Sequence, residues 1–460
     1  MDTNELKALK EERAKRWDDL YRGIIPDRVP IDFNLSTEVY IEEYGLPLGK
    51  TLWTLEHLED AFYNMAQHLP ADMLPKDSGR LPFHSIVSGN LGVQMGSGGF
   101  MQHPEVHTME PEEYDEFIES PYDFVLSKAI PRLFSNMTGV DPARAMAVFY
   151  MSIKSKNDTM ARYGQAYAKV SERLGYYAIP GPMGSRSLAP LDFVADYQRG
   201  FTGMSKDLKR CPEKVKEASD AVVPLLVKYA KPAVKSHLGS AWMPGHMPTF
   251  MRTKEFEKLY YPSFSQLIHA TAENGQAFKI FCEDDWTRYL DYLRDLPQGT
   301  RLLVEKGDPK VWKDKLGDKM ILSGFYPIML LKTGTKEECI DKMKELIDTL
   351  GPGGNWYFNF DKTIITLNSI KVENLYAVIQ YLAENGKYDN AGQRAWKQNT
   401  EDTIHKCLDT LPPVNSKYYK TREQIAEEYK DYILEDCREI LYDQVAAIEY
   451  DMMKNILGCF

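Results

Sequence analysis

The chain has 460 residues, of which 43% are apolar and 27% are charged, so it is long enough for two or three domains or for one large barrel. Its 56 basic and 67 acidic residues give a net charge of −11, which argues against the basic surface that nucleic-acid binding requires. No apolar run approaches the roughly 20 residues that cross a bilayer, and the charged segment 1–23 lacks the apolar core of a secretory signal. We therefore expect a cytoplasmic protein with no membrane span and no nucleic-acid partner.

The six cysteines are spread along the chain without a CxxC pair. A disulfide framework would be denser, and a structural zinc site would need closer spacing. Free thiols in a reducing cytosol are the expected state.

Short apolar runs alternate with helix-length amphipathic segments along most of the chain. Segment 1–23 is predicted to be an amphipathic helix, Pro212 opens a second helix, segment 255–274 is a third, and segment 336–350 carries apolar residues at helical spacing. The predicted strands cover residues 28–34, 175–182, 232–238, 277–282, 300–305, 320–324 and 355–360. This order indicates parallel strands joined by helical crossovers, either in an eight-stranded barrel or in an open doubly wound sheet.

The glycine pattern decides between these two folds. An open dinucleotide-binding sheet would carry G-x-G-x-x-G after its first strand, but the stretch after Asp32 has no such glycines. We therefore predict an α/β fold of the (β/α)8 type over residues 1–392, with an insertion at about 60–170. Residues 393–460 are predicted to form a helical extension that packs on the barrel or on a dimer partner.

Polar residues just after the predicted strands are the candidate site residues, because barrel sites lie where strands end. The block Cys282-Glu283-Asp284-Asp285 is the most informative, since three successive carboxylates in an apolar mouth would raise the pKa of at least one or hold a cation. Alternatively, Asp284 and Asp285 cap the following helix, which still leaves one useful carboxylate. The other candidates are Asp32, Asn34, Arg186, His237, His246, Glu305, Tyr326, Asp361 and Lys362.

Three of these candidates have a structural alternative. His237 could be a hydrogen-bonded core residue, Arg186 could form an ion pair instead of holding an anionic group, and His246 lies on a proline-rich loop that covers the pocket or is merely solvated. No G-x-S-x-G, H-E-x-x-H or Walker motif occurs, which argues against serine nucleophiles and nucleotide hydrolysis.

Four phrases occur in a specific order in residues 200–385: FEKLYYP at 256–262, GFYPIMLLKTGT at 324–335, GPGG at 351–354 and NLYAV at 374–378. Through these phrases the segment resembles the uroporphyrinogen decarboxylase superfamily, which includes methylcobamide-dependent methyltransferases. Together with DRVP at 27–30, the resemblance spans most of the chain up to about residue 390. It implies a distorted (β/α)8 barrel.

Two departures narrow the activity that the resemblance implies. Uroporphyrinogen decarboxylases carry an arginine-rich segment near the N-terminus, whereas segment 32–40 has no arginine, so a tetra-anionic porphyrinogen is disfavoured. The coenzyme M methyltransferases carry a zinc site of the type His-x-Cys with a distant Cys. With Cys282 aligned, the histidine position here is Ile280 and the distant cysteine falls near Asp361 or Lys362, so half of the soft ligands are missing.

The remaining similarity is to the first methyltransferases of O-demethylase systems, which take a methyl group from an aryl methyl ether and pass it to the Co(I) corrinoid of a partner protein. An acid or a metal ion, with zinc as the candidate, must activate the ether oxygen. The resemblance implies catalytic roles for Glu283, Asp284, Asp285, His237 and Tyr326, and substrate contacts for Asp32, Asn34, Arg186, Trp242, His246, Phe325 and Trp356. The metal candidates are Cys282, Glu283 and Asp361.

Three other functions stay open at this point. The first is a decarboxylase that acts on a less charged substrate, and the second is a methylcobamide:thiol methyltransferase. The third is an accessory protein that binds a corrinoid or tetrapyrrole without catalysis.

Overall fold

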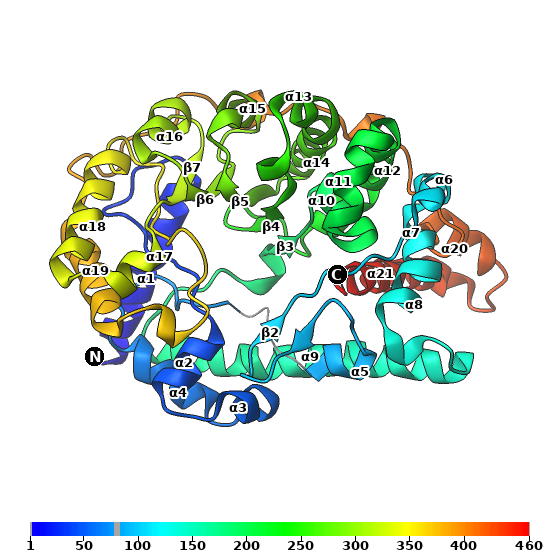
Figure 1. Ribbon diagram of the computed structural model, residues 1–460, viewed down its shortest axis with the longest axis horizontal. Coiled ribbons are helices and arrows are strands. Elements are labelled where there is room, and N and C mark those ends of the chain that lie inside the picture. The colour runs from blue at the N-terminus through cyan, green and yellow to red at the C-terminus, as the bar shows by residue number, and fades with distance from the viewer. Residues whose placement is uncertain (1, 78–82, 460) are drawn as a thin grey trace.

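The core of the protein is a row of parallel strands surrounded by helices (Figure 1). The structure is a computed structural model that describes residues 2–77 and 83–459. Five strands form one parallel sheet in the order β3-β4-β5-β6-β7. They span Ser185–Arg186, Ser240–Gly245, Ala277–Asp285, Arg301–Lys306 and Ile321–Gly324. A separate antiparallel pair consists of β1 (Gln94–Met95) and β2 (Met101–Gln102).

Three extended segments continue this sheet beyond β7. Segment 356–360 pairs in parallel with β7, and segment 29–35 pairs in parallel with segment 356–360. Segment 71–74 follows, with a backbone hydrogen bond of 2.9 Å to segment 29–35 and a parallel bridge to Tyr177, on the chain that enters β3. These contacts link the strands in the order of a distorted (β/α)8 barrel, which confirms the predicted fold.

The helices cover the outside of the strands, as Figure 1 shows. Those before β3 are α1 (Thr3–Tyr21), α2 (Thr37–Glu43), α3 (Leu48–Thr54), α4 (Leu58–Ala66), α5 (Phe83–Ser88), α6 (Tyr114–Glu119), α7 (Pro121–Phe124), α8 (Ile130–Leu133) and α9 (Pro142–Arg173). Those between β3 and β7 are α10 (Pro190–Val194), α11 (Gly200–Arg210), α12 (Pro212–Ala230), α13 (Thr253–Glu255), α14 (Tyr261–Glu273), α15 (Leu290–Asp295) and α16 (Pro309–Leu316). The last are α17 (Ile328–Thr333), α18 (Lys336–Leu350), α19 (Val372–Asn385), α20 (Arg422–Glu428) and α21 (Arg438–Leu457). The predicted helices at 1–23, 212–229 and 336–350 are confirmed as α1, α12 and α18.

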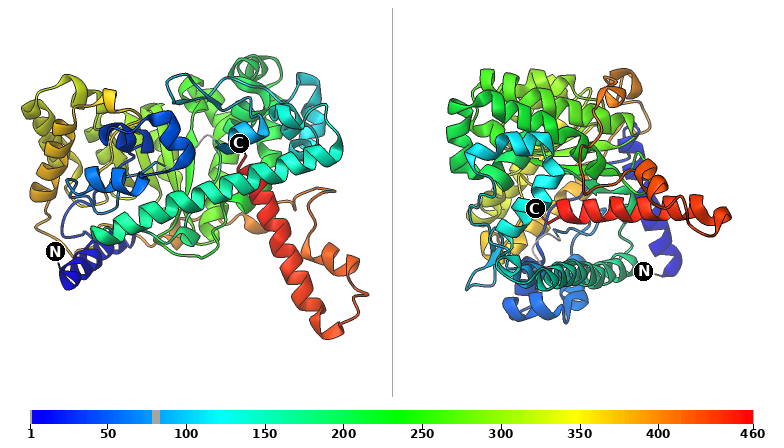
Figure 2. Two further views of the ribbon diagram at one scale, coloured as in Figure 1. Left: turned by 90° about the horizontal axis from the view of Figure 1, so that it is seen from below. Right: turned by 90° about the vertical axis from the view of Figure 1, so that its right-hand side faces the viewer.

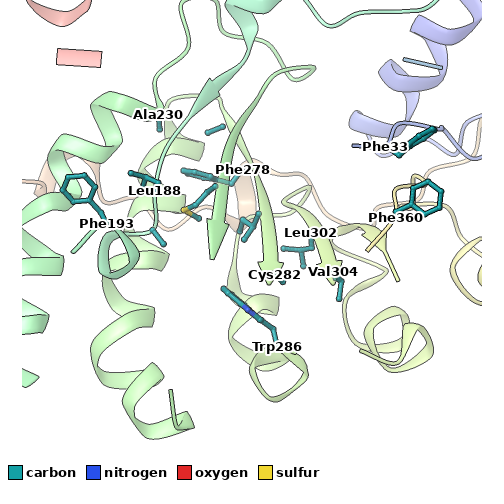
Figure 3. Close-up of a cluster of buried hydrophobic side chains, with 14 of the residues drawn as sticks. Phe33, Leu188, Phe193, Ala230, Phe278, Cys282, Trp286, Leu302, Val304 and Phe360 are labelled. Carbon is teal, nitrogen blue, oxygen red and sulfur yellow. The ribbon is translucent and has the colours of Figure 1, made fainter. Parts of the chain in front are cut away.

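The two faces of β5 have different environments. Phe278, Ile280 and Cys282 are at most 1% exposed and pack in the hydrophobic layer between strands and helices, where Figure 3 shows Cys282 near Trp286. The alternate residues Lys279 and Phe281 are partly exposed. Successive strand residues point to opposite faces, so Lys279, Phe281 and Glu283 face the barrel interior.

One end of the barrel is closed by α1. Trp17, Leu20 and Tyr21 from this helix cluster with Trp396 and with residues of three strand segments. The ring centroid of Tyr21 lies 3.4 Å from the guanidinium carbon of Arg301, which is the first residue of β6. The closed end is therefore the amino end of the strands. The carboxyl ends of the strands form the opposite mouth.

Three parts of the strand prediction need correction. Residues 175–182 are not a strand: Tyr177 forms an isolated bridge, residues 181–183 form a 3-10 turn, and β3 follows at Ser185–Arg186. Residues 232–238 are not a strand: Ser236 accepts a hydrogen bond from the Leu238 amide in a turn, and the fourth strand is β4 at Ser240–Gly245, whose Pro-Gly ending disguised it. Segment 71–74 belongs to the barrel, although it falls inside the predicted insertion at 60–170.

The C-terminal extension is less helical than predicted. Between α19 and α20, residues 386–421 contain only short 3-10 turns, and Trp396 packs against the closed end of the barrel. The helix α21 then projects from the body, whereas the long helix α9 lies along the side of the barrel (Figure 2). No helix in residues 2–77 and 83–459 has the length and apolar character that a membrane span requires.

Candidate functional site

A chain of three ionisable groups lies at the mouth of the barrel, where β4 and β5 end. His246 follows β4 directly, and its Nδ1 lies 2.7 Å from Asp196 Oδ2. Its Nε2 lies 3.2 Å from Glu283 Oε2 at the carboxyl end of β5. The imidazole therefore bridges two carboxylates, one from the segment after α10 and one from the inner face of the barrel.

The charges around His246 favour its protonated form. Burial alone would lower the pKa of His246, but the hydrogen bond to Asp196 and the charges of Asp196, Asp192 and Glu283 raise it to about 9. Burial raises the pKa of Glu283, and the His246 charge partly offsets this. At neutral pH, His246 therefore carries a proton and lies beside Glu283, a carboxyl group whose pKa is raised.

The buried carboxyl group of Asp192 holds the His246 loop in place. It accepts hydrogen bonds from the amides of His246 at 3.1 Å and Met247 at 2.9 Å, and from the Tyr260 hydroxyl at 2.9 Å. Burial and the neighbouring Asp196 raise the pKa of Asp192 to about 7. Because Asp192 is 1% exposed, its role is to position the loop.

A second group of charges follows β5 and β6. Glu305 accepts hydrogen bonds from the Asp284 amide at 2.9 Å and from Lys362 Nζ at 2.6 Å. Asp284 pairs with Lys306 at 2.7 Å and has a φ of 61°, next to a register shift between β5 and β6. A left-handed non-glycine residue of this kind is typical of functional loops. Both predicted residues, Glu305 and Lys362, thus lie at the mouth.

Asp361 completes the mouth from the end of segment 356–360. Its Oδ1 accepts a hydrogen bond of 3.1 Å from the Ile328 amide, and burial raises its pKa to about 6. Asp361 is therefore a second group that can exchange a proton near neutral pH.

Below the mouth, the inner face offers an aromatic pair and a lysine. Trp242 of β4 and Phe281 of β5 stack with their ring centroids 6.2 Å apart and their planes at 15°. Lys279 Nζ lies 5.9 Å from the Trp242 ring and 3.7 Å from Asp32 Oδ2, on the opposite side of the barrel. Lys279 and Asp32 lie on opposite sides of the barrel, so their pairing shows that both side chains point into its interior. Arg186 pairs in register with Trp242 and shares its inner face.

Four predicted site residues do not join this group. His237 precedes β4, at the closed end of the barrel, where its Nε2 lies 2.6 Å from Asp18. Tyr326 is buried and donates its hydroxyl hydrogen to the Cys339 carbonyl at 2.9 Å. Trp356 is fully buried on the outer face, and Phe325, with a φ of 67°, is only 6% exposed and packs against Trp312.

Asp285 and Asn34 have local roles in the backbone. Asp285 is exposed and accepts a hydrogen bond of 2.8 Å from the Thr287 amide, at the start of the 3-10 turn Thr287–Tyr289. Asn34 is partly buried, and its amide donates to the side chain of Asn359 at 3.3 Å.

The structure does not assemble the predicted metal set of Cys282, Glu283 and Asp361. Cys282 is fully buried on the outer face, and burial raises the pKa of its thiol, whereas Glu283 faces inward. On the inner face of β5, a His-x-Cys pattern would occupy Phe281 and Glu283, and neither offers a soft ligand. A zinc site of the thiol-binding type therefore does not fit these residues.

One other group in the described part of the chain has the composition of a metal site. His269, Asp295 and His405 place their ligand atoms within 4.8 Å of one another, on the outside of the barrel. However, His269 Nδ1 accepts a hydrogen bond of 3.0 Å from the His405 amide. The hydrogen of His269 must then sit on Nε2, so neither ring nitrogen has a free lone pair for a metal.

Sequence reasoning missed Asp192, Asp196, Lys279 and Phe281. The alternation of side chains along a strand could have found Lys279 and Phe281, because they precede Glu283 at intervals of two residues. The strand-end rule could not have found Asp192 and Asp196. Both lie about 50 residues before His246, and they follow no predicted strand end.

The charges around His246 lead to a prediction about pH. We expect the His246 ring to titrate near pH 9, and the Asp196→Asn variant to titrate at lower pH because it loses the main group that favours the imidazolium. NMR of histidine ring resonances measures both midpoints, with His246→Gln to assign the signal. A wild-type midpoint near 6.5 would contradict the ion-pair chain.

Comparisons with known proteins agree with the fold. The family model for uroporphyrinogen decarboxylase (URO-D) matches residues 181–384, which contain β3 to β7 and every group at the mouth. Through these residues, the chain is similar to the uroporphyrinogen decarboxylase family. Members of this superfamily share the barrel that the strands form here.

A solved structure has a similar fold over a longer part of the chain. The chain is similar to a methyltransferase from Methanosarcina mazei, with a TM-score of 0.51 and 14% sequence identity. The match covers 81% of this chain and 98% of the other. At this identity, the likeness is one of fold. No curated protein matches the sequence.

Proposed function

We propose that this URO-D superfamily protein is a methyltransferase that cleaves the methyl ether of a methoxylated aromatic compound and transfers the methyl group to the Co(I) corrinoid of a partner protein. The observation that carries the proposal is the position of the His246–Glu283 pair, a proton-holding group directly above an aromatic pair on the inner face. The similarity to a methyltransferase of the same fold is consistent with this reaction class.

The chemistry needs an acid at this position. When the methyl carbon leaves an aryl ether, the C–O bond breaks and the oxygen keeps the electron pair, so the leaving group is a phenolate unless a proton arrives. In our proposal, Glu283 delivers the proton to the ether oxygen and His246 replaces it, while Asp196 holds the ring in place. A Co(I) corrinoid, when bound at the mouth, would supply the electron pair for the new bond to the methyl carbon.

The alternation of β5 suggests how the substrate lies. Lys279, Phe281 and Glu283 face inward at intervals of two residues, which places them about 6.6 Å apart along the strand. A single aromatic ring beside Phe281 and Trp242 would then have its methoxy group near Glu283. Its opposite end would lie near Lys279, which can donate hydrogen bonds to a carboxylate.

Exposed apolar side chains near the mouth are suited to a protein partner. Phe201 and Phe250 are 44% and 61% exposed, and their rings contact each other with centroids 4.7 Å apart. Met329, in the helix after β7, is 55% exposed. The corrinoid protein would dock on these residues, since large exposed apolar groups mark interaction surfaces.

A decarboxylase is the second candidate function. It is favoured by Lys279 and Arg186 on the inner face, because both can hold a substrate carboxylate. A thiol methyltransferase is disfavoured, since the inner positions on β5 lack the ligands that would bind and deprotonate a thiol.

A methyl-transfer assay tests the proposal. The purified protein is mixed with a corrinoid protein reduced to Co(I) and with a panel of methoxyarenes, and the absorbance change that accompanies methylation is followed. We expect methylation together with release of the phenol, and the fastest reaction with arenes that carry a carboxylate opposite the methoxy group. Release of carbon dioxide without methylation would select the decarboxylase, and corrinoid binding without turnover would select the accessory protein.

A further inference from the structure

The segment 421–449, which we name the C-terminal arm, extends away from the barrel (Figure 2). It is anchored at both ends. Tyr419 is buried against Tyr122 before the arm, and the Tyr450 hydroxyl after the arm donates a hydrogen bond of 2.7 Å to the Lys228 carbonyl. The part of α21 that lies in the arm, residues 438–449, spans about 18 Å.

The arm carries apolar side chains that its own chain does not cover. Ile433 is 90% exposed, Leu434 is 56% exposed and Ile440 is 57% exposed, and Ile448 on the same helix is 67% exposed. Ile440 and Ile448 are eight residues apart and lie on one face of α21. Such a row on a projecting helix indicates a surface that is covered by a partner.

A second uncovered apolar row lies on α9 of the same chain. Met146 is 70% exposed and Tyr150 is 66% exposed, four residues apart on one face of the helix. The exposure of both residues shows that the arm does not cover this row in its own subunit. The chain end after α21 contacts α9 at Lys156, whose Nζ donates a hydrogen bond of 2.6 Å to the Gly458 carbonyl.

The two rows are complementary in charge. The arm has nine acidic and three basic residues, a net charge of −6. The part of α9 that carries the apolar row, residues 142–157, has Arg144, Lys154 and Lys156 and no acidic residue. Lys154 also pairs with Asp158 at 2.6 Å on its own helix, so Arg144 is the freer of the two exposed cations.

We infer that the protein forms a symmetric dimer in which the C-terminal arm of each subunit packs on α9 of the other. A two-fold dimer makes this contact twice, because each chain carries both surfaces. The occupant is a second copy of this chain, since the acidic apolar arm and the basic apolar helix are found together on one chain. This inference does not depend on the proposed function.

Light scattering after size exclusion tests the dimer in three steps. The wild type is expected to have twice the mass of the chain at micromolar concentration, and Ile440→Glu and Tyr150→Glu are each expected to have the mass of one chain. Val311→Glu, at a residue on α16 that is 43% exposed, is the matched control and should remain dimeric. High salt should weaken the dimer, because it screens the charges of the two surfaces.

Mixing the two monomeric variants distinguishes this dimer from other pairings. The Tyr150→Glu chain keeps an intact arm and the Ile440→Glu chain keeps an intact α9, so the mixture should recover one of the two contacts and form a heterodimer. A monomeric wild type would overturn the inference. So would a dimer that is disrupted by Ile440→Glu but not by Tyr150→Glu, since the arms would then pair with each other.

Discussion

Replacing Glu283 with glutamine is expected to reduce the rate of methyl transfer at least about 100-fold, the lower end of what general acid catalysis contributes. Glutamine keeps the size and the hydrogen bonding of the side chain, but it cannot give a proton to the ether oxygen. The reduction should appear in kcat, with KM changed little, because the ring contacts of Trp242 and Phe281 remain. Steady-state assays with the wild type and the variant measure both constants.

A neighbouring carboxylate supplies the control for Glu283→Gln. Asp285 is two residues away and exposed, and its side chain accepts a hydrogen bond from the Thr287 amide. Asp285→Asn is therefore expected to keep the rate within about twofold, since surface changes of this kind have small effects. Equal losses in the two variants would argue against a specific role for Glu283.

Replacing Asp72 with asparagine is expected to lower the free energy of unfolding by about 3–5 kcal/mol. Asp72 is fully buried and accepts hydrogen bonds from Arg16 at 2.5 Å, from Arg28 at 2.7 Å and from the Ile31 amide at 2.7 Å. Without the Asp72 charge, the guanidinium of Arg16, which is 1% exposed, is paired only with Glu12 and Asp27, whose side chains are more exposed. Urea denaturation measures the change.

The control for Asp72→Asn uses the same arginine. Glu12 also pairs with Arg16, but its side chain is 58% exposed. Glu12→Gln should therefore cost about 0–1 kcal/mol, as exposed ion pairs do. A similar loss in both variants would mean that burial of Asp72 is not what makes the network stabilising.

The part of the site that could be predicted from the sequence is the part that lies directly after strands. Glu283, Glu305 and Asp361 follow assigned strands, and all three are at the mouth. The prediction that Cys282 belongs to the site is wrong by one residue. Neighbouring residues on a strand face opposite sides, so Glu283 faces the interior and Cys282 does not. The run Ile280-Phe281-Cys282 has no polar alternation that would show which of its residues face inward.

Trp356 and His237 illustrate the same limit in two other forms. Trp356 is one residue away from Tyr357, which reaches the barrel interior, and both are aromatic, so the composition alone does not separate them. His237 lies near the end of the predicted strand 232–238, but the strand is β4 at Ser240–Gly245, so His237 precedes it and lies at the opposite end of the barrel. Contacts such as that of His246 with Asp196 depend on how α10 packs, and a single sequence does not contain that information.

The alternation of β5 separates two kinds of evolutionary change. Ile280 and Cys282 are locked in the layer under the helices, so new side chains there would disturb the packing. Lys279 and Phe281 are partly exposed on the inner face, so different side chains at these positions would alter the fit to a ligand. A lineage could therefore acquire a new aromatic substrate by changing alternate residues of this strand, while the barrel itself stayed the same.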